Sequence, residues 1–497
     1  MKSRHLLGTS LASLALVAVG MSPAPAAPAL NDPQQQAVAW LADQIPSGTH
    51  LFETAYTDFN TGDTVYYVDY GVNLDVQHTL RELGQSSTAD QVYAAVVADG
   101  AKYTDAYGTR YAGAVGKLAT YMQLKGDAPQ IDDGGTSRDL LDDLNDLMVP
   151  DGAEKGRFKD APDSEWQSAN NIGQSWGVRA LALAGDASTG DAAAFLLSQQ
   201  CSDGGFRESP GASPCTSTAD ATAFAAVALD DVGGHASDVA KAVAWLKAKQ
   251  KADGSVDDAG NPNTNSTGLA AQLFADHGES AAAKHAAAWI KKQQLTGGPD
   301  AGAIASTAAD RAAQGSKKIA VLAQDKYVRA TYQAALGLAS WELGPVDKLS
   351  LKVSAGKPKQ GDTITVTATG QDAYGQSLGD VSDDIEITSS VATDTVDGNR
   401  VTFNHASPHV LTVTHVPSGT TAAITVQVTP VSASGGSGGS SAGSNGSGAS
   451  GGDSLPDTGS PARPWEPGLA ALMVLLGVAL VAVARERRFV AAHRSDS

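Results

Sequence analysis

Apolar and polar positions follow a helical period over residues 31–345 and a strand period over residues 346–430. In the first segment, apolar residues recur three and four positions apart, as in helices that bury one face. In the second, Val, Ile and Thr alternate with polar residues, as in "DTITVTATG" and "HVLTVTHV", which predicts short strands. The change of period indicates an all-α part followed by an all-β part.

A motif recurs along the helical part. Alanines surround one aromatic residue in four similar helices, at Trp40, Phe195, Trp245 and Trp289. Glycine turns follow the last three, as "CSDGGF", "KADGSV" and "TGGPDAG". The last three aromatic residues are 50 and 44 positions apart, and the 155 positions before Phe195 leave room for three such periods. A fixed period of this length is typical of stacked helix pairs, and we predict six of them.

The two helices of a pair differ in composition. The first is amphipathic, and we expect its Lys and Gln side chains to face solvent. The second is rich in Ala, Gly and Leu on nearly every side, as in "TSTADATAFAAVALDDVG", so we expect neighbours to enclose it. Asn, Ser and Thr at its start are typical helix caps. Because one pair cannot bury its apolar face alone, six inner and six outer helices are expected to close into a ring.

The repeats "FLLSQQCSDGGF" and "AWLKAKQKADGSV" resemble those of the prenyltransferase and squalene-cyclase superfamily, whose fold is an (α/α)6 toroid. The resemblance covers most of residues 31–345. The stretch "STADATAFAAVA" contains Asp220 but not the cysteine of the zinc-binding Asp-x-Cys pair. The Asp-x-Asp-Asp acid of the cyclases and the Cys-Gly-Glu-Gln of thioester domains are also missing. We therefore expect neither these activities nor a metal or other cofactor.

The two cysteines of the chain, Cys201 and Cys215, lie in one short segment. In an oxidising compartment such a pair is expected to form a disulfide, worth about 3 kcal/mol in the chain-entropy model. A zinc site is the alternative, but the segment has no Cys-x-x-Cys and no nearby pair of histidines.

The strand-rich residues 346–430 are predicted to form a small β-sandwich, with a hairpin turn at Asp397 and Gly398 in "VDGNRV". The stretch "GDTITVTATGQDAYGQSLGDV" resembles bacterial immunoglobulin-like stalk domains, which implies a spacer or adhesive module. Residues 432–454 follow, of which 18 of 23 are Gly or Ser. They are expected to act as a flexible tether with a reach of roughly 26 Å.

The N-terminus has the pattern of a secretory signal peptide over residues 1–26. Lys2 and Arg4 precede the apolar run "LASLALVAVG", and small residues at Ala24 and Ala26 follow. A membrane anchor is the alternative, although the apolar run is short for one.

The C-terminus combines "LPDTG", the uncharged residues 468–484 and the basic segment 485–497. This order resembles the cell-wall sorting signal of Gram-positive surface proteins. The resemblance implies that a sortase cleaves between Thr458 and Gly459 and links Thr458 to peptidoglycan. Residues 468–484 would span the membrane only until that transfer. The predicted sorting signal comprises Leu455, Pro456, Asp457, Thr458 and Gly459.

The chain is acidic, with a formal net charge of −19. Loss of Lys2 and Arg4 with the signal peptide, and of five arginines and three acids beyond Thr458, would leave −23. This charge argues against nucleic acid and anionic lipid as partners and is typical of a soluble extracellular protein.

We predict a ligand site at the mouth formed by the N-terminal ends of the inner helices, suited to a sugar or another polar small molecule. The candidate residues are Tyr70, Asn73, Tyr107, Arg110, Asn171, Gln174, Trp176, Asp220, Asn265, Arg329 and Tyr332.

Three alternatives stay open. The same residues could only cap and brace helices, which would make the ring a scaffold. The ring could be an enzyme on polysaccharide or isoprenoid substrates, with acid candidates Asp69, Asp75, Asp163, Glu165 and Asp220. Finally, "DFNTGD" at Asp58 is similar to a calcium loop, but its glycine is one position early.

Overall fold

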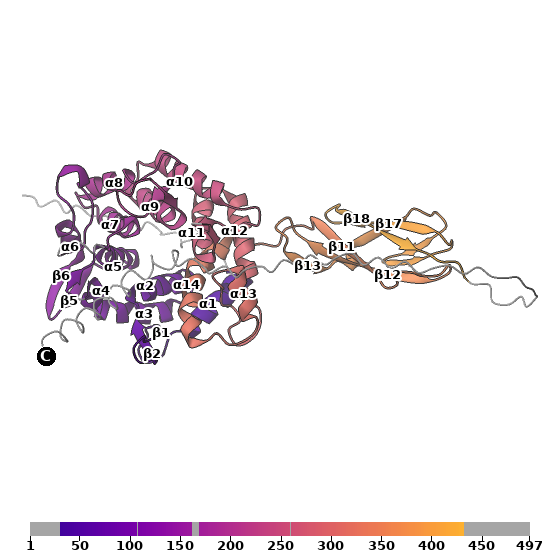
Figure 1. The fold of residues 1–497 in the computed structure, drawn as a ribbon, viewed down its shortest axis with the longest axis horizontal. Coiled ribbons are helices and arrows are strands. Elements are labelled where there is room, and N and C mark those ends of the chain that lie inside the picture. Colours follow the sequence, from indigo (N-terminus) through magenta and orange to yellow (C-terminus); the bar gives the residue numbers. More distant parts are fainter. Residues whose placement is uncertain (1–29, 107, 162–167, 259, 432–497) are drawn as a thin grey trace, which may run out of the picture.

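The computed structural model describes residues 30–106, 108–161, 168–258 and 260–431 (Figure 1). They form a ring of helices from which an elongated β domain projects. The predicted signal peptide, tether, sorting signal and apolar C-terminal run lie outside the described residues. Within the described part, no helix is both long enough and apolar enough to cross a bilayer.

The helices alternate between an outer and an inner layer along the chain. In the described residues, the inner layer consists of α2 (Tyr70–Glu82), α5 (Ala112–Lys125), α7 (Asn171–Ala184), α9 (Ala219–Val232), α11 (Thr264–Asp276) and α14 (Val321–Gly337). The outer layer consists of α1 (Asp32–Asp43), α3 (Ser86–Ala98), α6 (Leu140–Asp146), α8 (Thr189–Leu197), α10 (Ala236–Lys249) and α12 (Ser280–Gln293). Each inner helix packs against the next, and α14 contacts α2, so the ring is closed and the predicted toroid is confirmed.

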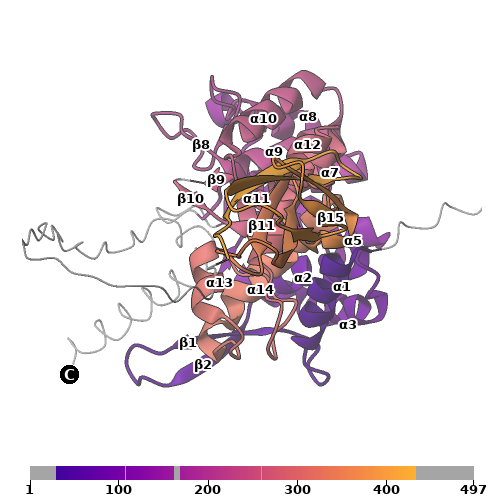
Figure 2. The same ribbon diagram turned by 90° about the vertical axis from the view of Figure 1, so that its right-hand side faces the viewer.

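Shorter elements lie in the connections. The helical ones are α4 (Gly100–Thr104), α13 (Ala308–Gln314) and the 3-10 turns Gly152–Glu154 and Leu338–Ser340. The others are two-stranded hairpins: β1 (Glu53–Thr57) with β2 (Thr64–Val68), β3 (Asp105–Ala106) with β4 (Thr109–Arg110), β5 (Gln130–Asp133) with β6 (Thr136–Asp139), β7 (Phe206–Arg207) with β8 (Ser217–Thr218), and β9 (Asp257–Asp258) with β10 (Asn261–Pro262). Apart from β5–β6, each hairpin leads into the N-terminus of an inner helix, and Figure 2 shows β1–β2 and β9–β10 at the same side of the ring.

Small residues let the inner helices approach closely. Where α5 meets α7, a Cβ atom added to Gly116 would lie 2.6 Å from the backbone nitrogen of Gly177. The side chains of Asn170 and Asn263 accept hydrogen bonds from backbone N–H groups in the first turns of α7 and α11. The Ala- and Gly-rich composition and these caps therefore have the structural roles that the sequence predicted.

The glutamine that follows an outer helix joins one repeat to the next. Its Nε2 donates to the carbonyl of the following turn glycine and to a carbonyl in the first turn of the next outer helix, at 2.9–3.2 Å. The sets are Gln200 with Gly204 and Asp238, Gln250 with Gly254 and Ala282, and Gln294 with Gly302 and Pro33. The expectation that such glutamines face solvent is wrong for Gln294, which is fully buried, whereas Gln200 and Gln250 are half-buried.

The glycine turn that follows each of these outer helices is held by contacts with both the inner and the outer layer of helices. The backbone N–H groups of Phe206, Val256 and Ile304 each donate at 2.9 Å to a threonine hydroxyl of an inner helix. Gly254 has a φ of +95°, and a Cβ atom there would lie 2.2 Å from the carbonyl oxygen of His285 in α12. The recurrent motif is therefore a structural joint between consecutive repeats.

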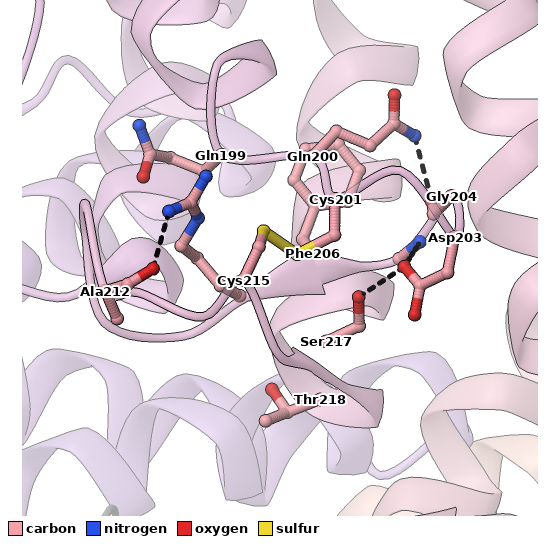
Figure 3. Close-up of a disulfide and its surroundings, with 12 residues drawn as sticks. Gln199, Gln200, Cys201, Asp203, Gly204, Phe206, Ala212, Cys215, Ser217 and Thr218 are labelled. Atoms are coloured by element: carbon pink, nitrogen blue, oxygen red, sulfur yellow. Dashed lines mark hydrogen bonds between the residues drawn. A yellow bond between two sulfur atoms is a disulfide. The ribbon is translucent and has the colours of Figure 1, made fainter.

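The predicted disulfide is present between Cys201 and Cys215 (Figure 3). It closes the loop that leads from the end of α8 to α9. Inside this loop, the Ser217 hydroxyl donates to Asp203 at 2.7 Å, and Arg207 donates to the carbonyl of Ala212 at 2.8 Å. The disulfide thus braces one joint of the ring.

The β domain consists of two antiparallel sheets around one core. One sheet contains β11 (Lys348–Val353), β12 (Thr363–Gln371), β13 (Ser377–Asp380), β15 (Thr395–Asp397) and β16 (Arg400–Thr402), and the other contains β14 (Ile385–Ser389), β17 (Pro408–His415) and β18 (Thr421–Gln427). Alternate residues such as Ile364, Val366 and Val413 fill the core. Asp397 pairs with Arg400, as the predicted turn requires.

The β domain contacts the ring beside α12. Lys292 Nζ donates to the carbonyl of Tyr374 at 2.6 Å, and the rings of His285 and Tyr374 lie 5.3 Å apart. Trp341 also donates a hydrogen bond to Gln376. The β domain is therefore attached to the ring by side-chain contacts as well as by the chain.

Replacing Gly254 by alanine is expected to destabilise the ring by about 2 kcal/mol or more, because the added methyl group meets the α12 backbone and the residue has positive φ. Thermal unfolding should show a midpoint lowered by several degrees. Gly48→Ala, at a position with open space around it, should leave the midpoint within about one degree, and equal midpoints for both variants would contradict the role of the joint.

Candidate ligand-binding cavity

A cavity of about 250 Å³ lies in the centre of the ring. All six inner helices named above contribute to the lining, which consists of Asp75, His78, Thr79, Tyr121, Trp176, Arg179, Ala223, Phe224, Val227, Leu269, Gln272, Leu273, Asp276, Tyr332, Gln333 and Leu336. Most of these residues stand in the middle or the C-terminal half of their helices.

The two sides of the cavity differ in chemistry. Apolar side chains come mainly from α9, α11 and α14, with Phe224, Leu269 and Leu336 partly exposed to the cavity. Asp75 and His78 of α2 and Arg179 of α7 line the opposite arc, and α11 and α14 add the polar residues Gln272, Asp276 and Gln333. A mixed lining of this kind favours a compact ligand with an apolar body and a polar or charged group.

Asp75 is the best-connected polar group of the cavity. Its Oδ2 atom lies 2.7 Å from Lys117 Nζ, and its Oδ1 atom accepts a hydrogen bond of 2.8 Å from the Tyr121 hydroxyl. Tyr332 also lines the cavity and is close enough to Asp75 for the carboxylate to affect its pKa. Burial and the Asp75 charge raise the pKa values of Tyr121 and Tyr332, so both phenols keep their protons.

Aromatic rings flank this carboxylate. Trp176 lies 5.1 Å from Tyr121 and 5.6 Å from Phe224, measured between ring centroids. Lys117 and Arg179 each lie within 5.5 Å of the Trp176 ring, in cation–π geometry. Arg179 is held there by Asp231, with 2.6 Å between Nε and Oδ2.

His78 extends this group. Its ring lies 5.2 Å from that of Tyr121, and its partner in the helix is Glu82 at 3.9 Å. Burial lowers the pKa of His78 despite the neighbouring carboxylates. The imidazole is therefore uncharged at neutral pH and can act as a hydrogen-bond donor and acceptor.

Only part of the sequence-predicted site lies at the cavity. Trp176 and Tyr332 line it. Asn73, Asn171 and Gln174 are buried in the wall of the ring, where they bond backbone groups of neighbouring turns. These three side chains therefore brace the ring, and Tyr107 lies outside the described residues.

Other predicted residues form ion pairs and hydrogen bonds at the N-terminal ends of the inner helices. Arg329 contacts Asp69 at 2.7 Å and Asp325 at 2.9 Å. Burial opposes ionisation of Asp69, yet Arg329 and a backbone N–H hold its pKa below the ordinary value. Arg110 contacts Asp105 and Asp143. These arginine charges are therefore already balanced.

Tyr70 and Asn265 also have partners at this end. The Tyr70 hydroxyl donates to Asp99 at 2.8 Å, and the Asn265 amide donates to Gln333. Whether either residue also binds a ligand stays a prediction.

A group of carboxylates stands between α9 and α11. Burial and the charges of Asp220 and Asp258 raise the pKa of Glu208 to about 7. Burial and Asp258 raise the pKa of Asp220 to about 6, although Ser266 donates to it at 2.7 Å. Such carboxyls can hold a proton near neutral pH, as general acids do. Two other acid candidates, Asp163 and Glu165, lie outside the described residues.

The structure gives no support for a metal centre in the described part of the chain, where no group of three or more His, Cys, Asp or Glu side chains could hold a metal ion. In the loop that is similar to a calcium site, Asp58 Oδ1 accepts backbone hydrogen bonds from Asn60 and Thr61. That contact is a local turn.

The sequence reasoning missed His78, Tyr121, Arg179 and Phe224 as cavity residues. Their signal is weak, because each is a single polar or aromatic position in a helix that is otherwise rich in small residues. The spacing of Asp75 and His78, and of Trp176 and Arg179, by three positions does place each pair on one helix face.

No family model matches the chain, and no curated protein matches it. Several solved structures are similar to part of the chain. A protein from Actinoplanes is 14% identical, with a TM-score of 0.43, covering 62% of this chain and 98% of its own. The apo type II terpene cyclase MstE from Scytonema is 17% identical, with a TM-score of 0.45, covering 62% of this chain and 97% of its own.

An inactive variant of the alpha-1,6-mannanase GH76A of Salegentibacter sp., in complex with alpha-1,6-mannotriose, is 10% identical, with a TM-score of 0.41, covering 61% of this chain and 98% of its own. At these identities and scores the similarities assign no substrate and no activity to this chain. The helix contacts of the ring itself establish the toroid.

The raised pKa of Glu208 has a consequence for stability. Folded Glu208 keeps a proton that the unfolded chain releases above its ordinary pKa of 4.5, so stability falls as the pH rises from there to about 7. Glu208→Gln is therefore expected to stabilise the protein at pH 8, by on the order of 1 kcal/mol after solvent screening. At pH 4 the variant should match the parent in chemical denaturation. The same change at the exposed Glu53 should have no effect at either pH, and a Glu208 effect that grows on acidification would refute this assignment.

Proposed function

We propose that this chain is a secreted surface protein whose helical ring binds a ligand in its central cavity. The cavity supports this proposal because every inner helix contributes to its lining, and the lining combines charged, aromatic and apolar side chains. The recurrent motifs, by contrast, are occupied in joining repeats. The side chains that face the cavity are therefore the ones left to select a ligand.

The terminal segments support a cell-wall location. Residues 1–26 would direct export, and a sortase would join Thr458 to a peptidoglycan amine. Residues 432–454 would then separate the wall from the folded part. The β domain would serve as an immunoglobulin-like spacer, in keeping with its two sheets and its contacts with α12.

A surface enzyme is the second candidate. Its support is the carboxylate group of Glu208, Asp220 and Asp258, in which two carboxyls have pKa values near 7 and 6. Hydrolysis of glycosidic bonds requires a carboxyl that can donate a proton, and a raised pKa suits this role. Binding without catalysis remains our first choice because the cavity is separate from this group in its lining residues.

Attachment can be tested in a Gram-positive host that carries a sortase. The parent chain should appear in the wall fraction and be released by a peptidoglycan hydrolase. Thr458→Ala should move most of the protein to the membrane fraction, because the sortase should not recognise the altered motif. Ser447→Ala in the tether should behave like the parent, and wall attachment of Thr458→Ala would rule out the proposed route.

Ligand binding can be tested with glycan arrays and a library of polar small molecules, followed by a search for cleaved products. Val227→Trp would fill part of the cavity and should weaken binding of any cavity ligand by at least tenfold. Val410→Trp makes the same change on an exposed site of the β domain and should leave affinity unchanged. A ligand that binds Val227→Trp normally would place the site elsewhere, and released products would favour the enzyme.

A further inference from the structure

We propose that the ligand of the central cavity is a small organic cation with an apolar body, such as a substituted ammonium. This inference rests on the proposed function and names the ligand class. It follows from the charges at the cavity, from the direction of the inner helices and from the aromatic rings beside Asp75.

The inner helices all present the same end to the cavity mouth. In most pairs the connection from an inner helix to the next outer helix is short, as from α9 to α10 and from α11 to α12. Short connections make neighbouring helices antiparallel, so the inner helices run parallel to one another. Their C-terminal ends, with the negative end of each helix dipole, therefore surround the mouth near which the cavity lies.

Acidic residues add to this negative end. The last turn of α9 carries Asp230 and Asp231, that of α11 carries Asp276, and neither last turn contains a basic residue. Acids at helix C-termini oppose the helix dipole and cost stability. A locally unfavourable arrangement of this kind is typical of functional sites.

The cations near the cavity are already balanced. Lys117 pairs with Asp75, and Arg179 pairs with Asp231. His78 is uncharged at neutral pH. Among the described residues, no lysine or arginine forms an ion pair with Asp276, which lines the cavity. The cavity therefore carries an excess of negative charge and disfavours phosphates and carboxylates.

A site for an organic cation needs aromatic rings as well as a carboxylate. Lys117 and Arg179 already lie within 5.5 Å of the Trp176 ring, so a ligand cation would contact a different ring. Phe224 lies beside Trp176, is partly exposed to the cavity and is the ring that a ligand can reach. Quaternary ammonium groups are recognised by such rings together with a nearby carboxylate. The aliphatic side chains of α11 and α14 would cover the apolar body of the ligand.

The test compares three probes of nearly equal shape by isothermal titration calorimetry on the full chain in lipid nanodiscs. The probes are choline, its uncharged isostere 3,3-dimethylbutan-1-ol, and the anion 3,3-dimethylbutanoate. Choline should bind at least tenfold more tightly than the alcohol, and the anion should bind most weakly. Equal affinity for choline and the alcohol, preference for the anion, or no choline binding at millimolar concentration would overturn the inference.

Variants locate the effect. Asp276→Asn should lower choline affinity three- to tenfold and leave affinity for the alcohol unchanged, whereas Asp142→Asn on the outer helix α6 should change neither. Thermal unfolding checks that both variants fold. Val227→Trp should abolish choline binding, and choline binding that survives it would overturn the inference. A different outcome would reject only the ligand class: the parent binds a neutral glycan but not choline, and Val227→Trp loses the glycan. The proposed function would then still hold.

Discussion

The side-chain amide of one glutamine, shared between its own turn and the following outer helix, is the contact on which the ring depends. Gln200, Gln250 and Gln294 repeat it, and the last of them reaches back to the first helix through Pro33. Each amide donates to two carbonyl groups, one in its own turn and one in the first turn of the next outer helix. Because the same contact recurs at these three joints, the repeats that meet there are placed relative to one another by hydrogen bonds as well as by packing.

This joint explains the composition of the motif. The turn needs a residue without a Cβ atom where it meets the next outer helix, and it needs a hydroxyl from the inner helix to accept a backbone N–H. The residues that recur in each motif thus have structural roles in the ring. Selectivity for a ligand must come from positions that differ between repeats, such as Asp75, Trp176 and Asp276.

The sequence predicted the ring, the disulfide and the β-rich region well because each leaves a local pattern: a period, a pair of cysteines, an alternation. The site was harder. Helix-start residues such as Asn73 and Gln174 are easy to recognise, but the structure uses them to hold turns. The cavity residues lie further along the inner helices, and only the rotation of each helix, which packing sets, decides which of them face inward. The buried Gln294 shows the same limit, since its polarity indicated solvent.

The contacts that close the ring between α1 and the last repeat are also expected to form late in folding. Ribosomes make α1 first, yet its partners Gln294 and Gly302 come about 260 residues later. Contacts so distant in the chain form slowly because the intervening segment must first be brought together. Until the last repeat is made, one side of the first helix stays exposed. An incomplete ring would therefore be open to proteolysis and aggregation at that helix.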